Sequence, residues 1–272
     1  LKALLNKKIN AICFENLRDE GNILSVVRAM SEIVGATSIF IAAEYLSNVT
    51  GGKGLMLGGF TGVPPTEIVI LGAGTVGEYA ARTALALGAE VKVFDSSIYR
   101  LRRLQNNLGS RVFTSVMQPI VLGKAITTCD VVIGAIRATH GRSPCIVMEE
   151  TVTRMKPNSV VIDVSIDQGG CFETSEVTNH KDPVFRKHDV IHYCVPNIAS
   201  RVPRTASYAL TNIFTPILVD IGDMGGLMNV VWSKPGIREA LYIYQGHLTN
   251  KDLANMYNLP YKDIELLVVS NQ

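Results

Sequence analysis

The sequence predicts an α/β protein in which a doubly wound parallel sheet forms the larger part, joined by remnants of a second, discontinuous α/β domain. Two observations support this fold class. From residue 66 to about residue 192, short apolar runs alternate with helical patterns, as expected for parallel strands covered by helices on both faces. The last third of the chain then resembles a return to a part that the chain leaves near its start.

The overall composition limits the class of protein. A chain of 272 residues is long enough for one large domain or two ordinary ones. Its formal net charge of +2, with 18% charged residues, gives no bias toward nucleic acid. No apolar run reaches the roughly eighteen residues that span a bilayer, and no signal peptide is present, so we expect no membrane partner. The chain starts at Leu1 without a methionine, and we expect a fragment.

The cysteines indicate a reducing compartment. They are odd in number, lie far apart and form no C-x-x-C or histidine-linked metal spacing, so we expect free thiols in the cytoplasm and no metal site. These residues are Cys13, Cys129, Cys145, Cys171 and Cys194.

The segments before the sheet contain two short elements and a long helix. Lys2–Lys7 predicts the end of a helix, and the alternation of Ile9–Phe14 predicts a strand. Apolar residues at three- and four-residue steps predict a helix over Ile23–Tyr45, whose length suits a connector between two domains. Residues 47–65 are rich in glycine and proline. Gly52-Lys53 lies in this stretch, but it lacks the upstream glycine and the Ser/Thr of a phosphate loop, so we reject that motif.

A strand, a glycine turn, a helix and a second strand follow in immediate succession. Ile68–Leu71 leads into the G-x-G-x-x-G turn Gly72–Gly77, and the following helix ends at Gly88. The second strand, Val91–Phe94, delivers Asp95. This is the order of a Rossmann-type dinucleotide-binding unit, and the agreement of all four parts makes the assignment stronger than a lone glycine motif.

Each residue type in this unit has a physical role. Gly72 permits the tight turn, Gly74 lets a pyrophosphate approach the backbone, and Gly77 lets the helix pack against the strand. The amides and the positive dipole end of the helix favour phosphate. Asp95 can accept hydrogen bonds from a ribose 2′-hydroxyl and repels a 2′-phosphate, which favours NAD over NADP. Arg100, about one helical turn further on, leaves this preference open.

The α/β alternation continues beyond Asp95. We expect helices near 97–108, 118–128 and 146–155, and strands at Arg111–Thr114, Val131–Ile136, Val160–Ile162 and Val190–His192. A long helix over Thr205–Ile221, a shorter segment and a tail complete the chain.

Polar residues follow two of these strands, where ligands bind in open α/β sheets. Asp167 follows the first strand, and either caps the glycine turn after it or acts as a carboxylate in catalysis. Asn197 follows the second, and either occupies a turn or bonds a nicotinamide amide through its own amide. The residues themselves leave both alternatives open.

The motifs together resemble those of the alanine dehydrogenases, which share their architecture with the NAD(H)-binding subunit of proton-translocating transhydrogenase. The resemblance covers nearly the whole chain in order. Its most specific block is SIDQGGCFE at 165–173. Further matches are Met30–Glu32, the glycines of 51–59, the turn at 72–77, Tyr193–Asn197 and Tyr208–Asn212.

The resemblance implies NAD-dependent oxidative deamination of L-alanine to pyruvate and ammonia, and the reverse reaction. It implies a catalytic role for Asp167 and a homo-oligomer, commonly a hexamer. The family's catalytic histidine and carboxylate-binding residues would lie upstream of Leu1. The implied cofactor contacts are Ser31, Thr75, Val76, Asp95, Arg100, Ile136, Arg137, Asp167, Val195 and Asn197.

The resemblance also implies a division of the chain into functional parts. Residues 1–25 and 204–272 would belong to the substrate domain, and residues 26–203 would form the NAD domain with its leading helix. Three departures from the family pattern are Met117, Ile198-Ala199, and Asp220 with Met224 in place of an acid and histidine pair. The first weakens a contact on the adenine side, the second replaces a Met-Pro pair after the asparagine, and the third removes a metal pair.

Three alternatives remain at this stage. The transhydrogenase subunit is the nearest, but its characteristic loop is absent and its sequence differs where this chain has IDQGG. Other imine-forming dehydrogenases are possible because substrate choice lies largely upstream. A truncated module that binds NAD without turnover is the third, so turnover by this chain itself is left open.

Overall fold

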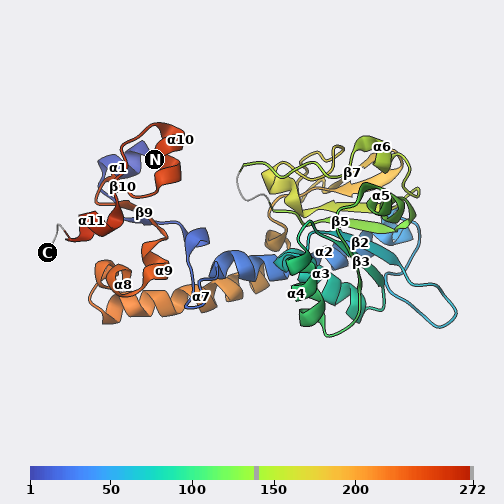
Figure 1. Ribbon diagram of the computed structural model, residues 1–272, viewed down its shortest axis with the longest axis horizontal. Helices are drawn as coiled ribbons and strands as arrows, with labels where there is room; N and C mark the ends of the chain where they lie inside the picture. The colour runs from blue at the N-terminus through green and yellow to red at the C-terminus, as the bar shows by residue number, and fades with distance from the viewer. Residues whose placement is uncertain (138–140, 270–272) are drawn as a thin grey trace. The chain divides into compact units, whose positions relative to one another are not determined.

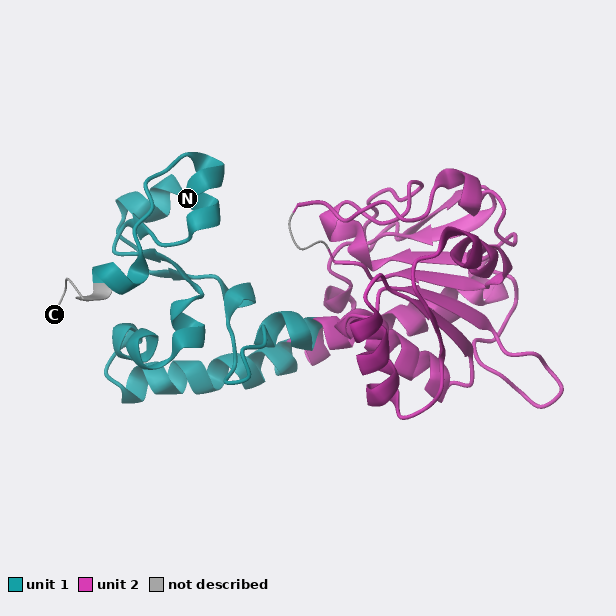
Figure 2. Ribbon diagram, in the orientation of Figure 1, with its two compact units in different colours: residues 1–30, 207–272 teal, residues 31–206 magenta. Residues whose placement is uncertain are grey.

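The computed structural model describes residues 1–137 and 141–269 and divides into two compact units (Figure 2). One unit comprises residues 1–30 and 207–272, and the other comprises residues 31–206. The borders predicted from the sequence, 25/26 and 203/204, lie within a few residues of these. The functional roles assigned to the two parts stay a prediction.

The larger unit is built on a single mixed sheet (Figure 1). In the described residues it has seven strands in the order β4-β3-β2-β5-β6-β8-β7, parallel except for β7, which pairs antiparallel with β8. The order in which the strands follow one another across the sheet reverses at β2, which pairs with β3 on one side and β5 on the other. In open α/β sheets, ligands bind at such a switch point. The bounds are β2 Glu67–Leu71, β3 Glu90–Phe94, β4 Phe113–Ser115, β5 Val131–Gly134, β6 Val160–Asp163, β7 Val184–Lys187 and β8 Val190–Tyr193.

This sheet confirms the predicted fold class, but the sequence analysis missed β7. His188 and Asp189 have φ values of 54° and 58°, so they form a tight turn that joins β7 to β8 as a hairpin. Such turns usually contain glycine or asparagine. Neither residue gave that signal, and the sheet was therefore predicted to be wholly parallel.

Helices cover both faces of the sheet (Figure 1). Helices α2, α3 and α4 lie on one face, and α5 and α6 lie on the other. Val69, Val132 and Val161 of three adjacent strands pack with residues of α5 and α6 in one buried cluster. The bounds are α2 Ser25–Leu46, α3 Thr75–Ala86, α4 Ile98–Leu108, α5 Pro119–Thr128 and α6 Glu149–Val152.

Helix α2 makes a close contact with the start of α3. A Cβ atom at Gly35 would lie 2.4 Å from the carbonyl oxygen of Val76 and 2.8 Å from Cβ of Tyr79. Only glycine therefore fits at this crossing. The contact fixes the first turn of α3, which is the turn that follows the glycine motif.

The sequence analysis found no uninterrupted apolar run of about eighteen residues, and the structure adds one long and largely apolar helix, α2. Among the residues that the structure describes, α2 is long and apolar enough to cross a membrane by length and composition. The pair α7 (Pro203–Asp223) and α8 (Leu227–Ser233), bent by 109°, would pass the same test if it were one span. The sequence analysis predicted this helix, over Ile23–Tyr45, and Glu32 and Glu44 keep any uninterrupted apolar run within it well below eighteen residues. Core helices pass the same test, and 44% of the most apolar window of α2 is buried.

Two predicted elements are shorter than expected because their backbone bonds elsewhere. The strand predicted to reach Ile136 ends at Gly134, since the Ile136 amide donates to the Ser165 hydroxyl at 3.0 Å. The helix predicted over 146–155 is confined to α6, since the Ile146 and Val147 amides both donate to the carbonyl of Cys171.

The smaller unit contains a short antiparallel sheet in the order β1-β9-β10. The strand predicted at Ile9–Phe14 is only β1, because a 3₁₀ turn begins at Phe14. The core of the smaller unit includes Val26, Val230, Val231 and Leu241. The bounds are α1 Lys2–Asn6, β1 Ala11–Ile12, α7 Pro203–Asp223, α8 Leu227–Ser233, α9 Pro235–Arg238, β9 Leu241–Tyr244, β10 His247–Leu248, α10 Lys251–Tyr257 and α11 Ile264–Val269.

Candidate functional site

The glycine turn between β2 and α3 has the geometry that its motif predicts. Gly72 has φ +110°, and a Cβ there would lie 2.4 Å from the carbonyl oxygen of Ala135. A Cβ at Gly77 would lie 1.9 Å from the carbonyl oxygen of Gly72. At Gly74, by contrast, an added Cβ would meet no atom within 4 Å. The first and third glycines are thus required by packing, whereas the second faces open space that a ligand can enter.

Helix α3 begins directly at this open space. Gly74 is its N-cap and supplies no side-chain acceptor, and Thr75 and Val76 are the first helical residues. The first amides of a helix lack partners within the helix, and the dipole adds positive potential there. Together with the space before Gly74, this end of α3 fits the pyrophosphate of a dinucleotide.

Asp95, the residue after β3, is tied to the same turn. Its side chain is almost fully buried, and Oδ2 accepts a hydrogen bond from the Ala73 amide at 2.7 Å. Oδ1 accepts from the Ser97 amide at 2.8 Å. Each carboxylate oxygen keeps further acceptor capacity for a ribose hydroxyl.

Two arginines of α4 contact this region. Nη1 of Arg100 lies 4.0 Å from Oδ2 of Asp95. Nη2 of Arg103 donates to the carbonyl of Ala73 at 3.2 Å. Sequence reasoning selected Arg100 and missed Arg103, although the two are three positions apart and therefore lie on the same side of the helix.

A 3₁₀ turn after β6, η3 (Val164–Gln168), carries Asp167. Asp167 is exposed, and its Oδ2 lies 3.5 Å from the amide nitrogen of Asn197 as a long, weak hydrogen bond. Asn197 has φ 52° and caps η4 (Ile198–Arg201), which follows β8. The structure therefore brings together the two polar strand ends that the sequence analysis selected.

Ser165 and Ser143 connect this turn to the segment after β5. The Ser165 hydroxyl accepts from the Ile136 amide, and the Ser143 hydroxyl donates to the Ile136 carbonyl at 3.1 Å. The Ser143 amide donates to the carbonyl of Gln168 at 2.8 Å. Both polar groups of the Ile136 backbone are thus held, and neither serine was selected from the sequence.

The other predicted contacts are placed less closely. Val195 is buried after β8, and Arg137 is exposed after Ile136. Ser31 is half-buried on α2, and within residues 1–137 and 141–269 no hydrogen bond or ion pair joins it to the other candidates. No group of three or more histidine, cysteine or acidic residues in the described part of the chain could hold a metal ion.

Asp163, the last residue of β6, is a buried carboxylate beneath η3. It accepts hydrogen bonds from the Ser165 amide at 3.0 Å, the Cys171 amide at 2.9 Å and the Ser175 hydroxyl at 2.6 Å. Burial raises the pKa of Asp163, and these hydrogen bonds, led by that from Ser175, offset only part of the increase. The sequence analysis assigned Asp163 no role.

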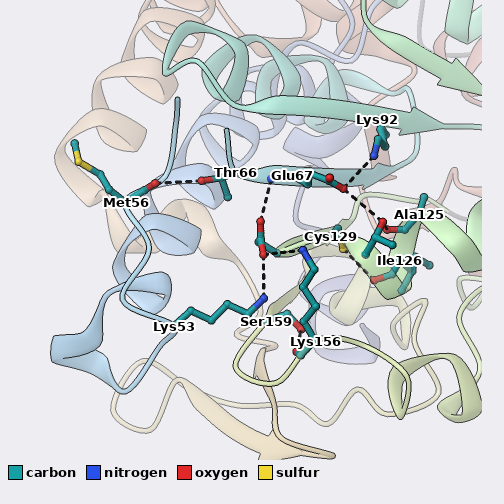
Figure 3. Close-up of polar contacts among 12 residues, drawn as sticks. Lys53, Met56, Thr66, Glu67, Lys92, Ala125, Ile126, Cys129, Lys156 and Ser159 are labelled. Carbon is teal, nitrogen blue, oxygen red and sulfur yellow. Dashed lines mark hydrogen bonds and ion pairs between the residues drawn. The ribbon is translucent and has the colours of Figure 1, made fainter. Parts of the chain in front are cut away.

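The opposite, amino-terminal edge of the sheet carries a second buried acid, Asp130. Its Oδ1 lies 2.9 Å from Nζ of Lys53 and 3.3 Å from Nζ of Lys156, and its Oδ2 accepts from the Glu67 amide at 3.1 Å. Figure 3 shows Lys53 and Lys156 reaching this cluster from different segments. Lys53, which we rejected as part of a phosphate loop, thus anchors the glycine-rich segment to the sheet.

Comparisons with known proteins agree with this geometry. Residues 38–251 match the family described as "Alanine dehydrogenase/PNT, C-terminal domain". The chain is 38% identical to an alanine dehydrogenase of Mycolicibacterium smegmatis over 96% of its own length and 70% of that protein. It is 39% identical to an alanine dehydrogenase of Methanococcus maripaludis over 97% and 71%, respectively.

Solved structures give the same result. A structure of L-alanine dehydrogenase superposes with a TM-score of 0.88 at 33% identity, covering 94% of this chain and 71% of that one. A transhydrogenase from Sinorhizobium meliloti has a TM-score of 0.76 at 21% identity, covering 91% of this chain and 70% of the other. The second likeness is one of fold alone.

Proposed function

Because this chain belongs to the alanine dehydrogenase/PNT family, we propose that it catalyses the NAD-dependent oxidative deamination of L-alanine to pyruvate and ammonia, and the reverse reaction. The family assignment agrees with the resemblance found in the sequence. One structural observation carries the proposal: an exposed carboxylate, Asp167, lies against Asn197 at the same sheet edge as the glycine turn. A dinucleotide-binding turn by itself would support only a binding role.

The residues at the switch point fit a dinucleotide. The open space at Gly74 and the first amides of α3 suit its pyrophosphate, and Asp95 suits the adenosine ribose. Asn197 would bond the carboxamide of the nicotinamide, and Ile136, Arg137 and Val195 would line the approach to it. When bound, the cofactor accepts the hydride that leaves Cα of alanine.

Asp167 supplies the proton chemistry in this proposal. Loss of the hydride leaves an iminium carbon that must be hydrated before ammonia can leave. A carboxylate beside that carbon stabilises its positive charge and accepts a proton from the attacking water. Because Asp167 is exposed and its carboxylate makes a single long hydrogen bond within the described residues, its oxygens are available for these steps.

Preference for NAD over NADP is the finer part of the proposal. Asp95 is buried beside the turn, so a 2′-phosphate placed there would meet a negative charge with little water to screen it. Arg100 and Arg103 weaken this repulsion and make the expected preference moderate. Ser31, Thr75 and Val76 stay proposed contacts.

The proposal extends to the organisation of the protein. Residues 31–206 would bind the cofactor, and the other unit would belong to the substrate domain. Following the family resemblance, we propose a cytoplasmic homo-oligomer, a hexamer, that uses no metal and binds neither nucleic acid nor membrane. Light scattering of the purified protein tests the oligomeric state.

A three-way assay tests the function. The purified protein is given L-alanine with NAD⁺, pyruvate and ammonia with NADH, or NADH with an oxidised NADP analogue. We expect absorbance changes at the NADH band with the first two pairs. Activity with the third pair alone would assign the chain to the transhydrogenase branch, and NADH binding without any turnover would favour a binding module.

A further inference from the structure

Asp163 joins both ends of the turn that carries Asp167. Its Oδ1 accepts from the Ser165 amide at the start of η3, and its Oδ2 accepts from the Cys171 amide just after the turn. Ser165 in turn holds the Ile136 amide through its hydroxyl at 3.0 Å. One fully buried carboxylate therefore fixes η3 and, through Ser165, the segment that follows β5.

Two glycines let the backbone pack closely against this carboxylate. Gly134, which pairs with Asp163 across β5 and β6, would place a Cβ 3.1 Å from Oδ1 and 2.4 Å from the sulfur of Cys171. Gly170 has φ +78°, and a Cβ there would lie 2.7 Å from Oδ2. A side chain at either position would thus crowd the carboxylate, and the turn can close over it only with glycine at these positions.

The donors to Asp163 require both oxygens to be acceptors. The backbone amides of Ser165 and Cys171 can only donate, and they approach different oxygens. An asparagine of the same shape would turn an NH₂ group toward one of these amides in either orientation. The charge is not needed for an ion pair, because the donors are amides and a hydroxyl.

Resting on the proposed function, we infer that Asp163 is a positioning residue that holds the Asp167 turn in its working geometry. It does not touch the substrate or the cofactor. Its effect on turnover should therefore pass through Asp167. A displacement of about 1 Å at a reacting group can lower a rate roughly 100-fold.

A double-mutant cycle with Asp163→Asn and Asp167→Asn tests this inference. We expect Asp163→Asn to lower kcat for alanine oxidation roughly 100-fold in the natural background. In the Asp167→Asn background it should change kcat by no more than about threefold, because the residue through which it acts is gone. Equal factors in both backgrounds would mean that Asp163 acts independently of Asp167 and would overturn the inference.

Amide hydrogen exchange gives a readout that needs no turnover. In Asp163→Asn, peptides that cover residues 164–171 should exchange faster, while those of β2 and β3 keep their protection. Unchanged exchange at 164–171 would refute the positioning role. If the natural protein does not oxidise alanine, the proposed function fails, and the exchange measurement still decides the role of Asp163.

Two further variants complete the design. Ser175→Ala removes one donor but leaves the carboxylate and both amide bonds, so exchange at 164–171 should stay near the natural rate. Gly170→Ala disturbs the same anchor from the turn, and it replaces Asp163→Asn in both measurements should that variant not fold. It should increase exchange at 164–171 and show the same dependence on Asp167; failure of either would overturn the inference.

Discussion

The two edges of the sheet each bury an acid, and they hold it in opposite ways. At the amino edge, Asp130 is paired with Lys53 and Lys156. At the carboxyl edge, Asp163 is held by amides and a hydroxyl. Burial by itself would raise the pKa of both carboxyls. For Asp130 the Lys53 hydrogen bond, the Glu67 amide and the lysine charges reverse the shift and leave a lowered pKa, whereas for Asp163 the pKa stays raised.

The difference indicates that the donors, rather than burial, decide what a buried carboxylate does. Ion pairs at the amino edge fasten a glycine-rich segment to the strands and contribute stability. Amide donors at the carboxyl edge fix a backbone turn that carries an exposed acid, Asp167, for which we propose a catalytic role. Variants at the first edge should therefore change stability, and variants at the second should change turnover or ligand choice.

The largest effect is expected for Asp167→Asn at the carboxyl edge. The amide cannot accept a proton from water, so kcat for alanine oxidation should fall by about 10²–10⁴-fold with little change in melting temperature. Steady-state kinetics and a thermal scan measure both. Asp189→Asn is the matched control, because Asp189 is also exposed and its φ of 58° suits asparagine. Equal losses in both variants would contradict the role of Asp167.

At the amino edge, Asp130→Asn should act on stability. It leaves the ammonium of Lys53, which is only 14% exposed, without its counter-charge. We expect a loss of roughly 2–4 kcal/mol in the free energy of unfolding, with kcat per folded molecule unchanged. Urea denaturation measures the first quantity. Lys156→Met should cost less than about 1 kcal/mol, because the Lys156 side chain is 43% exposed; a reversed order would refute this account.

Lowering the pH should change stability through a third buried group, the imidazole of His192. His192 of β8 is fully buried; its Nδ1 lies 3.1 Å from the Val190 carbonyl, and its Nε2 lies 2.9 Å from the Thr174 hydroxyl. A neutral ring that donates from Nδ1 and accepts at Nε2 satisfies both partners. Burial lowers the pKa of His192 from 6.5 to about 4.

The sign of the pH effect follows from that shift. Below pH 6.5 the unfolded chain binds a proton at His192 before the folded chain does, so stability should fall between pH 6.5 and 4 and level off below 4. The whole change is at most about 3 kcal/mol. Urea denaturation across this range, compared with His192→Gln, isolates the contribution. An identical pH dependence in the two proteins would exclude His192 as its source.

The smallest effect is expected at Asp95. Asp95→Ala removes the negative charge beside the ribose, so the ratio of kcat/KM for NAD to that for NADP should fall by about tenfold, with Arg100 and Arg103 limiting the change. Kinetics with each cofactor give the ratio. Ser97→Ala keeps the carboxylate and should leave the ratio unchanged. No change in Asp95→Ala would count against the ribose role.

Local patterns in the sequence predicted the parts of the molecule that depend on neighbouring residues. The glycine turn, the strand before it and the acid after the second strand lie within thirty residues, and each is specified by its own residue types. The polar strand ends at Asp167 and Asn197 were found because parallel strands place their carboxyl ends at one edge. Their contact at 3.5 Å agrees with that reasoning.

The features that were missed depend on residues far apart or on backbone conformations that sequence signals poorly. Lys53 and Asp130 are separated by 77 positions, and neither carries a mark of the other. In the sequence, Asp163 is only the last residue of a strand. Its role depends on the backbone amide of Cys171, eight positions later, which donates a hydrogen bond to its carboxylate. The hairpin before β8 escaped notice because two non-glycine residues adopt positive φ in its turn.

That hairpin also makes β7 an edge strand of the sheet. Within the described residues, strand β7 has one hydrogen-bonded neighbour, β8, and an open outer side of this kind is a site where a strand of another polypeptide can pair and begin aggregation. Its last two residues are Arg186 and Lys187, and Arg186 donates to the Asn158 side chain and to the carbonyl of Gly51. At the opposite side, β4 is only three residues long. The charged residues of β7 protect one edge of the sheet from intermolecular pairing, and the short length of β4 protects the other edge.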